Sequence, residues 1–556
     1  MQKYGELLRT LLEKRGIMDP EQAEIFLNPD YERDLYDPFL MKDMEKACRR
    51  IFDAIQKGER TVIYADYDCD GMPGAVILED FFKKIGFGNY EVYIPERNSE
   101  GYGLNKEAIE KFAEKGASLL LAVDLGITAV EEIAFAKEKG MNTIIVDHHL
   151  PPEKLPEAYA ILNPKIDGYP EKMLCAAGVA FKLVQGLLAA AEKIDTFPKI
   201  PAGWEKWLMD MAGIATLSDM VPLLGENRAL AHFGMKVLRK SPRPGLQKLL
   251  QKMRVEQRFL SPDDIAFMVV PKINAASRMD DPRRAYELLS TDDPAEAGAL
   301  ADHLTKINDE RKTIVTGIMR EVNRNFEKRN TEESLREVIV VGNPNWKIGV
   351  LGLVAGRLSE AYERPVFVWG ADENDCIRGS CRSDGSVSVV ELMHETKEYF
   401  TEFGGHELAG GFAAERTKIH FLEDALLSSF AKVKREKPEA AADYDLKLGL
   451  SDVTMKNWKE LQKMEPFGSG NPKPVFLFEN VKTESVKKFG KNGGEHIEIT
   501  FSDAGGRKIK AVSFFSGEDS FKAHVFPGSY ANLLASFDLS RFRGREELRL
   551  RIEDIY

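Results

Sequence analysis

The stretch Thr61–Gly71 constrains this chain most, because an apolar run there ends in three aspartates at alternate positions. Its first four residues are β-branched or aromatic, Asp66, Asp68 and Asp70 follow, and apolar residues with helical spacing occupy 75–82. This order predicts a buried strand, a tight turn and the first turns of a helix. Capping of the helix accounts for one aspartate, but three at the end of a buried strand repel one another unless a cation lies between them. The stretch therefore predicts a divalent-cation site, with an acidic helix-capping turn as the alternative.

The same alternation of strands and helices continues to about residue 220. Apolar strand candidates lie at 61–65, 91–94, 118–123 and 142–146, with helical segments near 73–86, 105–116 and 129–140. Alternation of this kind predicts a parallel sheet flanked by helices.

Acidic and imidazole side chains follow several of these apolar runs. Those after the third strand, the fourth strand and a later run are Asp124, Asp147, His148, His149 and Asp219. Because the ligand site of an open parallel sheet lies at the carboxyl ends of its strands, we expect these side chains to converge with the first three aspartates. Mixed carboxylate and imidazole ligands suit Mn²⁺ or Mg²⁺ better than zinc. Two such ions would activate a water and stabilise the leaving oxygen in phosphoester hydrolysis.

Beyond residue 220 the pattern divides the chain into further units. Residues 290–329 contain no proline after position 294 and predict one long helix, which would either bridge two lobes or lie on the surface of one domain. A second α/β pattern covers 337–431, and a charged linker follows at 432–440. From 445 onward, short strands between Gly and Asn turns predict a small all-β domain, with a barrel as its expected form.

Composition limits the classes of function without selecting one. The chain has 556 residues and a formal net charge of -12, which argues against a basic overall surface but allows a local groove for nucleic acid. Its amphipathic N-terminus lacks the apolar core of a signal peptide, and no apolar run is long enough for a membrane helix. The five cysteines show no zinc-type pairing, which favours a reducing, cytoplasmic location.

Four short motifs resemble those of a known enzyme family. DYDCDG, VDLGIT, VDHHLP and TLSDMVPL are similar to the four motifs of the DHH phosphoesterases. A narrower resemblance, to the bacterial exonucleases of this family that are specific for single-stranded DNA, covers nearly the whole chain. It rests on IPERNSEGYGLN, KINAASRM, GVLGLVAGRL, RGSCRS, GGHELAGG and EPFGSGNPKPVF.

The resemblance implies an α/β fold with two α/β lobes, the DHH and DHH-associated domains, joined by a long helix, plus a C-terminal OB-like β-barrel. The expected ranges are 1–50 for an N-terminal helical segment, 51–289 for the DHH catalytic domain, 290–329 for the connecting helix, 330–431 for the DHH-associated (DHHA1) domain and 441–556 for the OB-like nucleic-acid-binding domain. In the last domain, the basic and aromatic stretch RFRGR is the expected exposed contact with a single strand.

The resemblance also implies which residues hold the cations. Six would hold or support two Mn²⁺ or Mg²⁺ ions: Asp66, Asp68, Asp70, Asp124, His148 and Asp219. Asp124 is the expected bridge between the ions. Asp147 would orient the histidine pair, and His149 would lie near the scissile phosphate.

A second set of residues is implied to contact the nucleic acid. Arg278 matches a phosphate-contacting arginine, and His406 matches a residue of the second lobe that faces the strand. Arg97, Ser380 and Arg382 match a pocket for a 5′-terminal phosphate. Without the resemblance, each arginine alone would be interpreted as a surface ion pair.

Three positions depart from the family pattern, and one of them is Ser277, which stands where glycine is common. Tyr64 stands where some DHH enzymes have histidine, which leaves the ligand set of the first ion open. Lys347 stands where relatives commonly have histidine, and a lysine contacts phosphate but shuttles protons less readily near neutral pH.

The function implied is a metal-dependent 5′→3′ exonuclease that degrades single-stranded DNA to mononucleotides in DNA repair and recombination. A single-strand-binding protein and a helicase are candidate partners, and no membrane is expected. One alternative is a DHH phosphodiesterase acting on short oligonucleotides or cyclic dinucleotides, which usually needs only the two lobes. The other is a catalytically inactive DNA-binding scaffold, which would have no chemical need for the complete set of acids.

Overall fold

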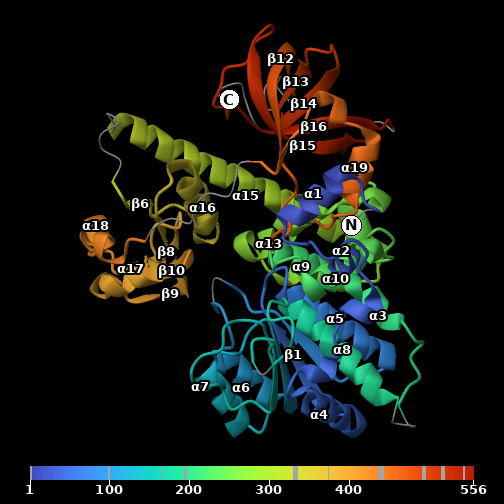
Figure 1. Ribbon diagram of the computed structural model, residues 1–556. Helices are drawn as coiled ribbons and strands as arrows, with labels where there is room; N and C mark the ends of the chain where they lie inside the picture. Colours follow the sequence, from blue (N-terminus) through green and yellow to red (C-terminus); the bar gives the residue numbers. More distant parts are fainter. Residues whose placement is uncertain are drawn as a thin grey trace.

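The computed structural model contains two α/β lobes and a β-domain (Figure 1). The first lobe is defined here as residues 60–290, the second lobe as 336–433 and the β-domain as 444–556. The structure describes residues 3–97, 100–166, 168–192, 197–329, 336–372, 375–435, 444–490, 496–514, 520–541 and 545–556. Most of the predicted linker at 432–440 and most of RFRGR therefore lie outside the described residues.

The first lobe is built on a five-stranded sheet in which every pairing is parallel, in the order β2-β1-β3-β4-β5. Its strands are β1 (Arg60–Ala65), β2 (Tyr90–Tyr93), β3 (Ala117–Val123), β4 (Asn142–Val146) and β5 (Ala160–Leu162). The sequence predicted the first four, because each is a distinct apolar run. β5 was not predicted, since three residues are too few to show a period.

Helices cover both faces of this sheet, because successive side chains of each strand point to opposite sides. Ile63 and Leu121 belong to the large apolar cluster on one face, and Val62 and Leu120 belong to a separate cluster on the other. The helices on the first face include α4 (Met44–Lys57), α5 (Gly71–Ile85) and α8 (Ala176–Ala191). Those on the second face are α6 (Lys106–Glu114) and α7 (Val130–Glu138).

The remainder of the first lobe is mostly helical. Its helices are α9 (Met209–Ser218), α10 (Gly225–Leu238), α11 (Pro244–Met253), α12 (Pro262–Asp264), α13 (Val270–Met279) and α14 (Arg283–Ser290).

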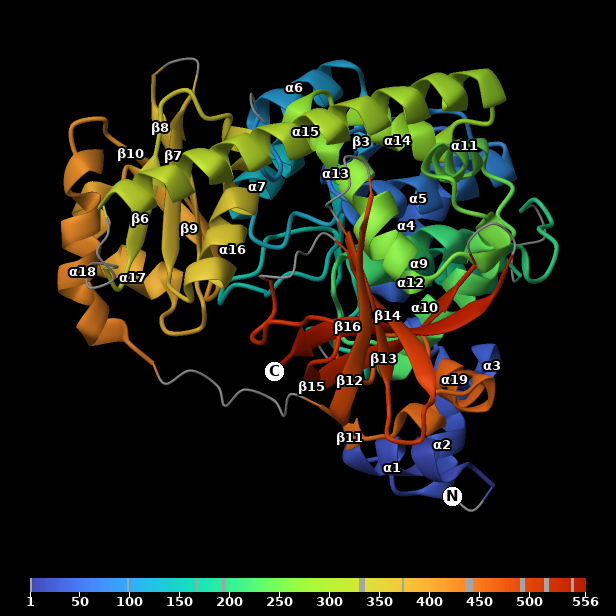
Figure 2. The ribbon, with the colours of Figure 1, turned by 90° about the horizontal axis from the view of Figure 1, so that it is seen from above.

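One long helix, α15 (Pro294–Arg329, 36 residues), connects the two lobes, so the bridging prediction is confirmed. Figure 2 shows it running from α11 and α14 to β6 and α16. Leu300 and Leu304 are buried in the core of the first lobe, whereas Val315 and Ile318 are buried in a cluster with the second lobe. A single rigid element is thus anchored in both lobes.

The second lobe carries a mixed sheet in the order β6-β7-β8-β10-β9, in which only β6 and β7 pair in parallel. Its strands are β6 (Ile339–Gly342), β7 (Val366–Ala371), β8 (Ile377–Arg382), β9 (Glu402–His406) and β10 (Ala409–Ala414). Its helices are α16 (Leu351–Tyr362), α17 (Val389–Glu395) and α18 (Leu422–Val433).

The β-domain has the strand order β11-β12-β13-β14-β16-β15, and an additional pairing of β12 with β15 joins distant members of this order. Its elements are β11 (Leu446–Lys447), α19 (Met455–Gln462), β12 (Phe476–Phe489), β13 (His496–Ser502), β14 (Lys508–Phe514), β15 (Tyr530–Ser540) and β16 (Glu547–Ile555). Its core contains Phe476 and Phe501, which are fully buried.

The first helices of the chain pack against this distant domain. They are α1 (Glu6–Lys14) and α2 (Pro20–Leu27), whereas α3 (Tyr31–Asp34) packs against α10 of the first lobe, with the ring centroids of Tyr31 and Phe233 5.8 Å apart. Leu8 and Phe26 lie in the same apolar cluster as Phe476. Arg228 of α10, which is 2% exposed, donates hydrogen bonds to the carbonyl oxygens of Phe26 at 2.6 Å and Met464 at 3.0 Å. The two ends of the chain therefore form one unit that is fastened to the first lobe.

Within the described part of the chain, no helix is both long and apolar enough to span a membrane. The predicted domain boundaries remain proposals, and α4 runs across residue 50.

Candidate metal centre and phosphate site

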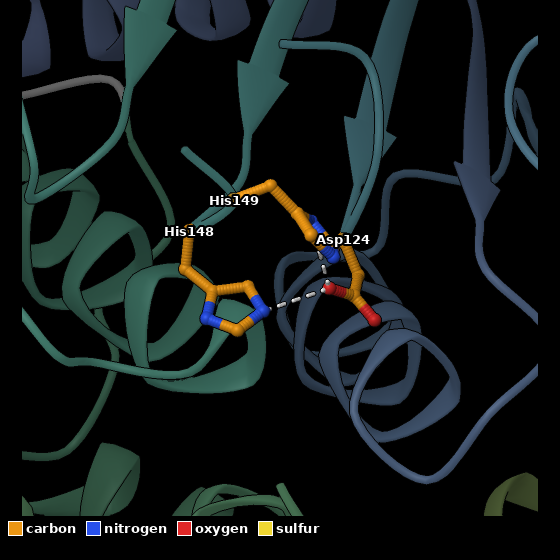
Figure 3. Close-up of side chains that lie close together, drawn as sticks. All are labelled: Asp124, His148 and His149. Atoms are coloured by element: carbon orange, nitrogen blue, oxygen red, sulfur yellow. Dashed lines mark ion pairs between the residues drawn. The ribbon is translucent and has the colours of Figure 1, made fainter. Parts of the chain in front are cut away.

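The acidic and histidine side chains meet at the carboxyl edge of the first-lobe sheet. Figure 3 shows Asp124, which follows β3, facing both His148 and His149, which follow β4. The Asp124 Oδ1 atom lies 3.3 Å from His148 Nε2 and 3.8 Å from His149 Nδ1. Because parallel strands end at one edge, residues far apart in sequence become neighbours there.

The described residues form three groups whose potential ligand atoms lie within 4.8 Å of one another. The groups are Asp66, Asp68 and Asp124; Asp124, His148 and His149; and Asp70, His148 and Asp219. Asp124 and His148 each belong to two groups. Of these two side chains, only the carboxylate of Asp124 has two oxygen atoms to offer as ligands. Every residue in the predicted metal set thus lies in this cluster.

Two buried carboxylates in the cluster have an oxygen atom without a hydrogen-bond partner. Asp66 is 4% exposed and Asp124 is 3% exposed, and the Oδ1 atom of each is unpartnered. Burial raises the pKa of both groups well above the ordinary value, and neighbouring aspartates raise it further. Buried carboxylate oxygens that accept no hydrogen bond are unfavourable, so this set of ligand atoms fits hard divalent cations.

The group of Asp70, His148 and Asp219 differs from Asp66 and Asp124 in its hydrogen bonds and in containing a histidine. Asp70 accepts hydrogen bonds from the backbone amides of Ala176 at 2.7 Å and Ala177 at 2.8 Å, at the start of α8. Burial and nearby Asp68 raise the pKa of Asp70 to about 7, and burial and Asp70 raise the pKa of Asp219 to about 8. Burial lowers the pKa of His148 to about 4, so its imidazole is neutral near pH 7 and keeps a lone pair for a metal.

Asp147 contacts the histidine pair rather than the other aspartates. It accepts hydrogen bonds from His149 Nδ1 at 2.8 Å and from the backbone amides of Ile127 at 3.0 Å and His148 at 2.7 Å. Burial by itself would raise the pKa of Asp147, but these donors hold it below its ordinary value. Conversely, burial would lower the pKa of His149, but Asp147 raises it overall. Asp147 therefore favours a protonated His149.

Local backbone geometry explains why glycine occupies position 71 and aspartate position 124 at the carboxyl edge of the sheet. A β-carbon at Gly71 would lie 2.5 Å from the carbonyl oxygen of Asp66, so only glycine allows the turn to close. Asp124 has a φ of 62°, in the left-handed region that aspartate tolerates better than most residues.

The three arginines predicted to contact phosphate lie close to one another and to the acidic cluster. Arg97 lies over the ring of Tyr67, with 5.3 Å between the guanidinium carbon and the ring centroid. Burial lowers the pKa of Arg278 to about 10, and the charges of Arg97 and Arg382 lower it further. Since Arg382 belongs to β8, the second lobe presents a cation to the arginines of the first lobe.

Ser380 and Arg382 lie at the first turn of α16. A β-carbon at Gly352 would lie 3.2 Å from Arg382 Nη2 and 3.6 Å from Ser380 Oγ. Glycine at this position leaves room for both side chains beside the helix N-terminus, where backbone amides favour anions.

His406 ends the exposed strand β9 and is itself exposed. It pairs with Ala409, which in turn pairs with Arg382, so His406 is two strands away from that arginine. It is not a member of the groups of metal-binding spacing that the described residues form.

Three residues near the cluster were not identified from the sequence. The hydroxyl of Tyr102 lies 3.4 Å from His149 Nε2 and 3.4 Å from the carbonyl oxygen of Asp124. Asn163 donates to the carbonyl oxygen of His149 at 2.9 Å, and Lys165 donates to that of His148. Tyr102 falls within the IPERNSEGYGLN stretch, which was the available signal. The other two follow β5, the strand that the sequence did not reveal.

Two of the departures from the family pattern, Tyr64 and Lys347, have structural explanations. The hydroxyl of Tyr64 donates to the carbonyl oxygen of Gly103 at 3.0 Å, and its ring lies in the cluster on the α6 face of the sheet. Tyr64 therefore does not face the aspartates. Lys347 donates to the carbonyl oxygen of Met279 at 2.9 Å, at the end of α13.

Three protein-family models match the chain. The DHH family N-terminal domain matches residues 60–211, the DHHA1 domain matches 336–432 and the RecJ OB domain matches 444–554. These matches agree with an α/β chain of two lobes followed by an OB domain.

Curated proteins and a solved structure are similar over most of the chain. The single-stranded-DNA-specific exonuclease RecJ of Bacillus subtilis is 34% identical over 99% of this chain, which spans 67% of that protein. RecJ of Thermus thermophilus is 31% identical over 86% of this chain and 68% of that protein. The crystal structure of RecJ from Thermus thermophilus in complex with Mn²⁺ superposes with a TM-score of 0.79 at 26% identity, covering 100% of this chain and 76% of that one. The chain therefore belongs to the RecJ family of DHH proteins.

Proposed function

We propose that this chain is a metal-dependent 5′→3′ exonuclease that degrades single-stranded DNA to mononucleotides. The observation that carries the proposal is the cluster at the carboxyl edge of the first-lobe sheet, where buried Asp66 and Asp124 have oxygen atoms without partners beside three arginines. Such a site combines cation ligands with phosphate-binding groups. The names of its RecJ relatives support single-stranded DNA as the substrate.

In this proposal, two Mn²⁺ or Mg²⁺ ions would be held by Asp66, Asp68, Asp70, Asp124, His148 and Asp219, and Asp124 would serve as a ligand for both. When bound, two such ions activate water as the nucleophile and stabilise the leaving oxygen in phosphodiester hydrolysis.

The protein groups around the cluster would bind and orient the strand. Arg278 would neutralise the scissile phosphate, and the pocket of Arg97, Ser380 and Arg382 would hold a 5′-terminal phosphate and so set the direction of cleavage. His149, kept protonated by Asp147, would donate a hydrogen bond to the phosphate. His406 would face the strand from the second lobe.

Biological context is also proposed. The relatives' activity supports a role in DNA repair and recombination, with a single-strand-binding protein and a helicase as candidate partners. The five cysteines are free, which agrees with the proposed cytoplasmic location.

The test uses a 5′-phosphorylated single strand with Mn²⁺, labelled at either end, and a blunt duplex for comparison. We expect labelled mononucleotide to be released at once from the 5′ label, while the 3′-labelled strand shortens progressively and the duplex resists. Asp124→Asn should be inactive, whereas Glu138→Gln, at an exposed position on α7, should cut normally.

Two results would favour the alternatives. Cleavage of only short oligonucleotides or cyclic dinucleotides would indicate the small-substrate phosphodiesterase. Binding of the strand without cleavage would indicate a scaffold.

A further inference from the structure

Three helices meet where α15 passes from the first lobe to the second. Figure 2 shows α13 and α16 lying along the same helix α15. A β-carbon at Gly349, just before α16, would lie 2.1 Å from the carbonyl oxygen of Arg278 in α13, so the two lobes are in close contact here. Val315 of α15 and Val354 of α16 are buried together. The three helices are therefore closely packed at this junction, which fixes the positions of the polar side chains beside it.

Each of the three helices contributes an arginine to this junction. Arg278 lies on α13, Arg311 on α15 and Arg357 on α16. The charge of Arg311 lowers the pKa of Arg278, and the charge of Arg357 lowers the pKa of Arg311 after burial, which is the larger cause. These guanidinium groups are thus close enough to repel one another.

The arginines lack the carboxylates that would offset this repulsion. Among the described residues, no carboxylate oxygen lies within 4.0 Å of the guanidinium of Arg278, Arg311 or Arg357. The two acidic residues that precede Arg311 on the same helix pair with lysines instead: Asp309 with Lys312 at 3.8 Å and Glu310 with Lys306 at 3.9 Å. In a chain of net charge -12, a group of unpaired arginines indicates that an anion from outside the chain neutralises them.

Polar atoms with no partner lie on the same helix faces. The Nε atom of Arg311 is buried and unpartnered. One turn earlier on α15, Asn308 is 1% exposed, and both its amide oxygen and its amide nitrogen are unpartnered. Asn274, one turn before Arg278 on α13, has an unpartnered amide oxygen. Buried polar groups are normally paired. Of these atoms, Arg311 Nε and Asn308 Nδ2 are hydrogen-bond donors, so this face has two donors available for an anion.

We propose that Arg311 and Arg357 form a further phosphate-binding site beside Arg278, which takes either a phosphate of the bound strand or the phosphate of a released nucleotide. Arginine pairs bind phosphate oxygens through parallel N–H donors, and both sources present the same tetrahedral anion. The inference rests on the proposed function only in that nucleic acid supplies the phosphate. It would place a second phosphate contact on the connecting helix, next to the scissile phosphate held by Arg278.

The test compares Arg311→Gln, Arg357→Gln and the double variant with Arg324→Gln, which removes the same charge from an exposed position on α15. In an Asp124→Asn background, fluorescence anisotropy measures binding of a 5′-phosphorylated single strand over a series of KCl concentrations. A strand phosphate predicts that the double variant binds about tenfold more weakly than the control, with a slope of log K against log salt reduced by about 0.7. Calorimetry with thymidine 5′-monophosphate is the second measurement.

The two measurements distinguish a strand phosphate from a released nucleotide, and both from the absence of a phosphate site. A reduced salt slope identifies a strand phosphate, whereas an unchanged slope with about tenfold weaker nucleotide binding identifies a released nucleotide. If both measurements match Arg324→Gln, the proposal is wrong. Arg357 is exposed, so its single variant decides the matter even if the double variant does not fold. An unaltered protein that cuts no strand would refute the proposed function, while the nucleotide measurement would still decide the site.

Discussion

Replacing Asp124 by asparagine should make the metal-free protein more stable, although it abolishes activity. Potential ligand atoms of Asp66, Asp68 and Asp124 lie within 4.8 Å of one another. At this separation and an effective dielectric constant of about 20, two charged carboxylates repel by roughly 3 kcal/mol. Protonation of the groups with raised pKa relieves part of this repulsion. The net gain for Asp124→Asn should therefore be about 2 kcal/mol at about pH 8.

The measurement is thermal unfolding in EDTA and then in Mn²⁺. A gain of about 2 kcal/mol should raise the first-lobe transition of the metal-free variant by about 4–8 °C. Mn²⁺ should raise the transition of the unaltered protein but not that of the variant, because the shared ligand is lost.

Asp147→Asn provides the matched control, because it removes the same charge from a neighbouring buried aspartate. Asp147 accepts hydrogen bonds from Ile127, His148 and His149, so its loss should destabilise the protein by about 2–4 kcal/mol. The reasoning is refuted if metal-free Asp124→Asn also unfolds below the unaltered protein, or if Mn²⁺ stabilises both equally.

Three further predictions concern protonation, the metal ligands and the join between domains. The pKa values of Asp70 and Asp219, about 7 and about 8, lie above the ordinary 3.8. Metal-free stability should therefore fall as pH rises from about 4 to about 8, and Mn²⁺ binding near pH 7 should release protons, detectable by calorimetry in buffers of different ionisation enthalpy. Tyr64→Phe should leave the Mn²⁺ affinity unchanged in the same calorimetry, since the hydroxyl of Tyr64 donates to the carbonyl oxygen of Gly103 and not to the aspartates. A loss of affinity of about tenfold would assign Tyr64 to the metal site. Arg228→Met should speed hydrogen exchange in α2 and in residues 464–466 by about a hundredfold, because the carbonyl oxygens of Phe26 and Glu465 lose the donor that pairs them, whereas exposed Lys236→Met should not.

The candidate site could be predicted largely from the sequence because its residues follow a rule of topology. Asp66, Asp124 and Asp147 each come directly after an apolar run, and parallel strands deliver such residues to one edge. The apolar runs before these aspartates are properties of the local sequence, and so is the negative charge that the aspartates bring to that edge. The long helix α15 was predictable for a similar reason, since its length and its lack of interior proline are local properties.

Pairings between distant segments could not be predicted in this way. Nothing in the pattern around Leu8 indicates that it packs with Phe476 in the β-domain, or that Arg228 binds carbonyl oxygens from two other parts of the chain. Amphipathic spacing shows that a helix buries one face, but it does not identify the surface that covers that face.

The sequence by itself therefore determined the parallel sheet, its acidic edge and the connecting helix, because strand period, the alternation of strands with helices and residue chemistry are properties of the local sequence. Only the tertiary structure decided how Asp147 and Asp124 differ, since Asp147 accepts several hydrogen bonds, whereas Asp124 lies among the other candidate metal ligands and its Oδ1 atom accepts none. It also decided that Arg278, Arg311 and Arg357 meet at one junction, because that depends on how three helices cross and not on any spacing along the chain.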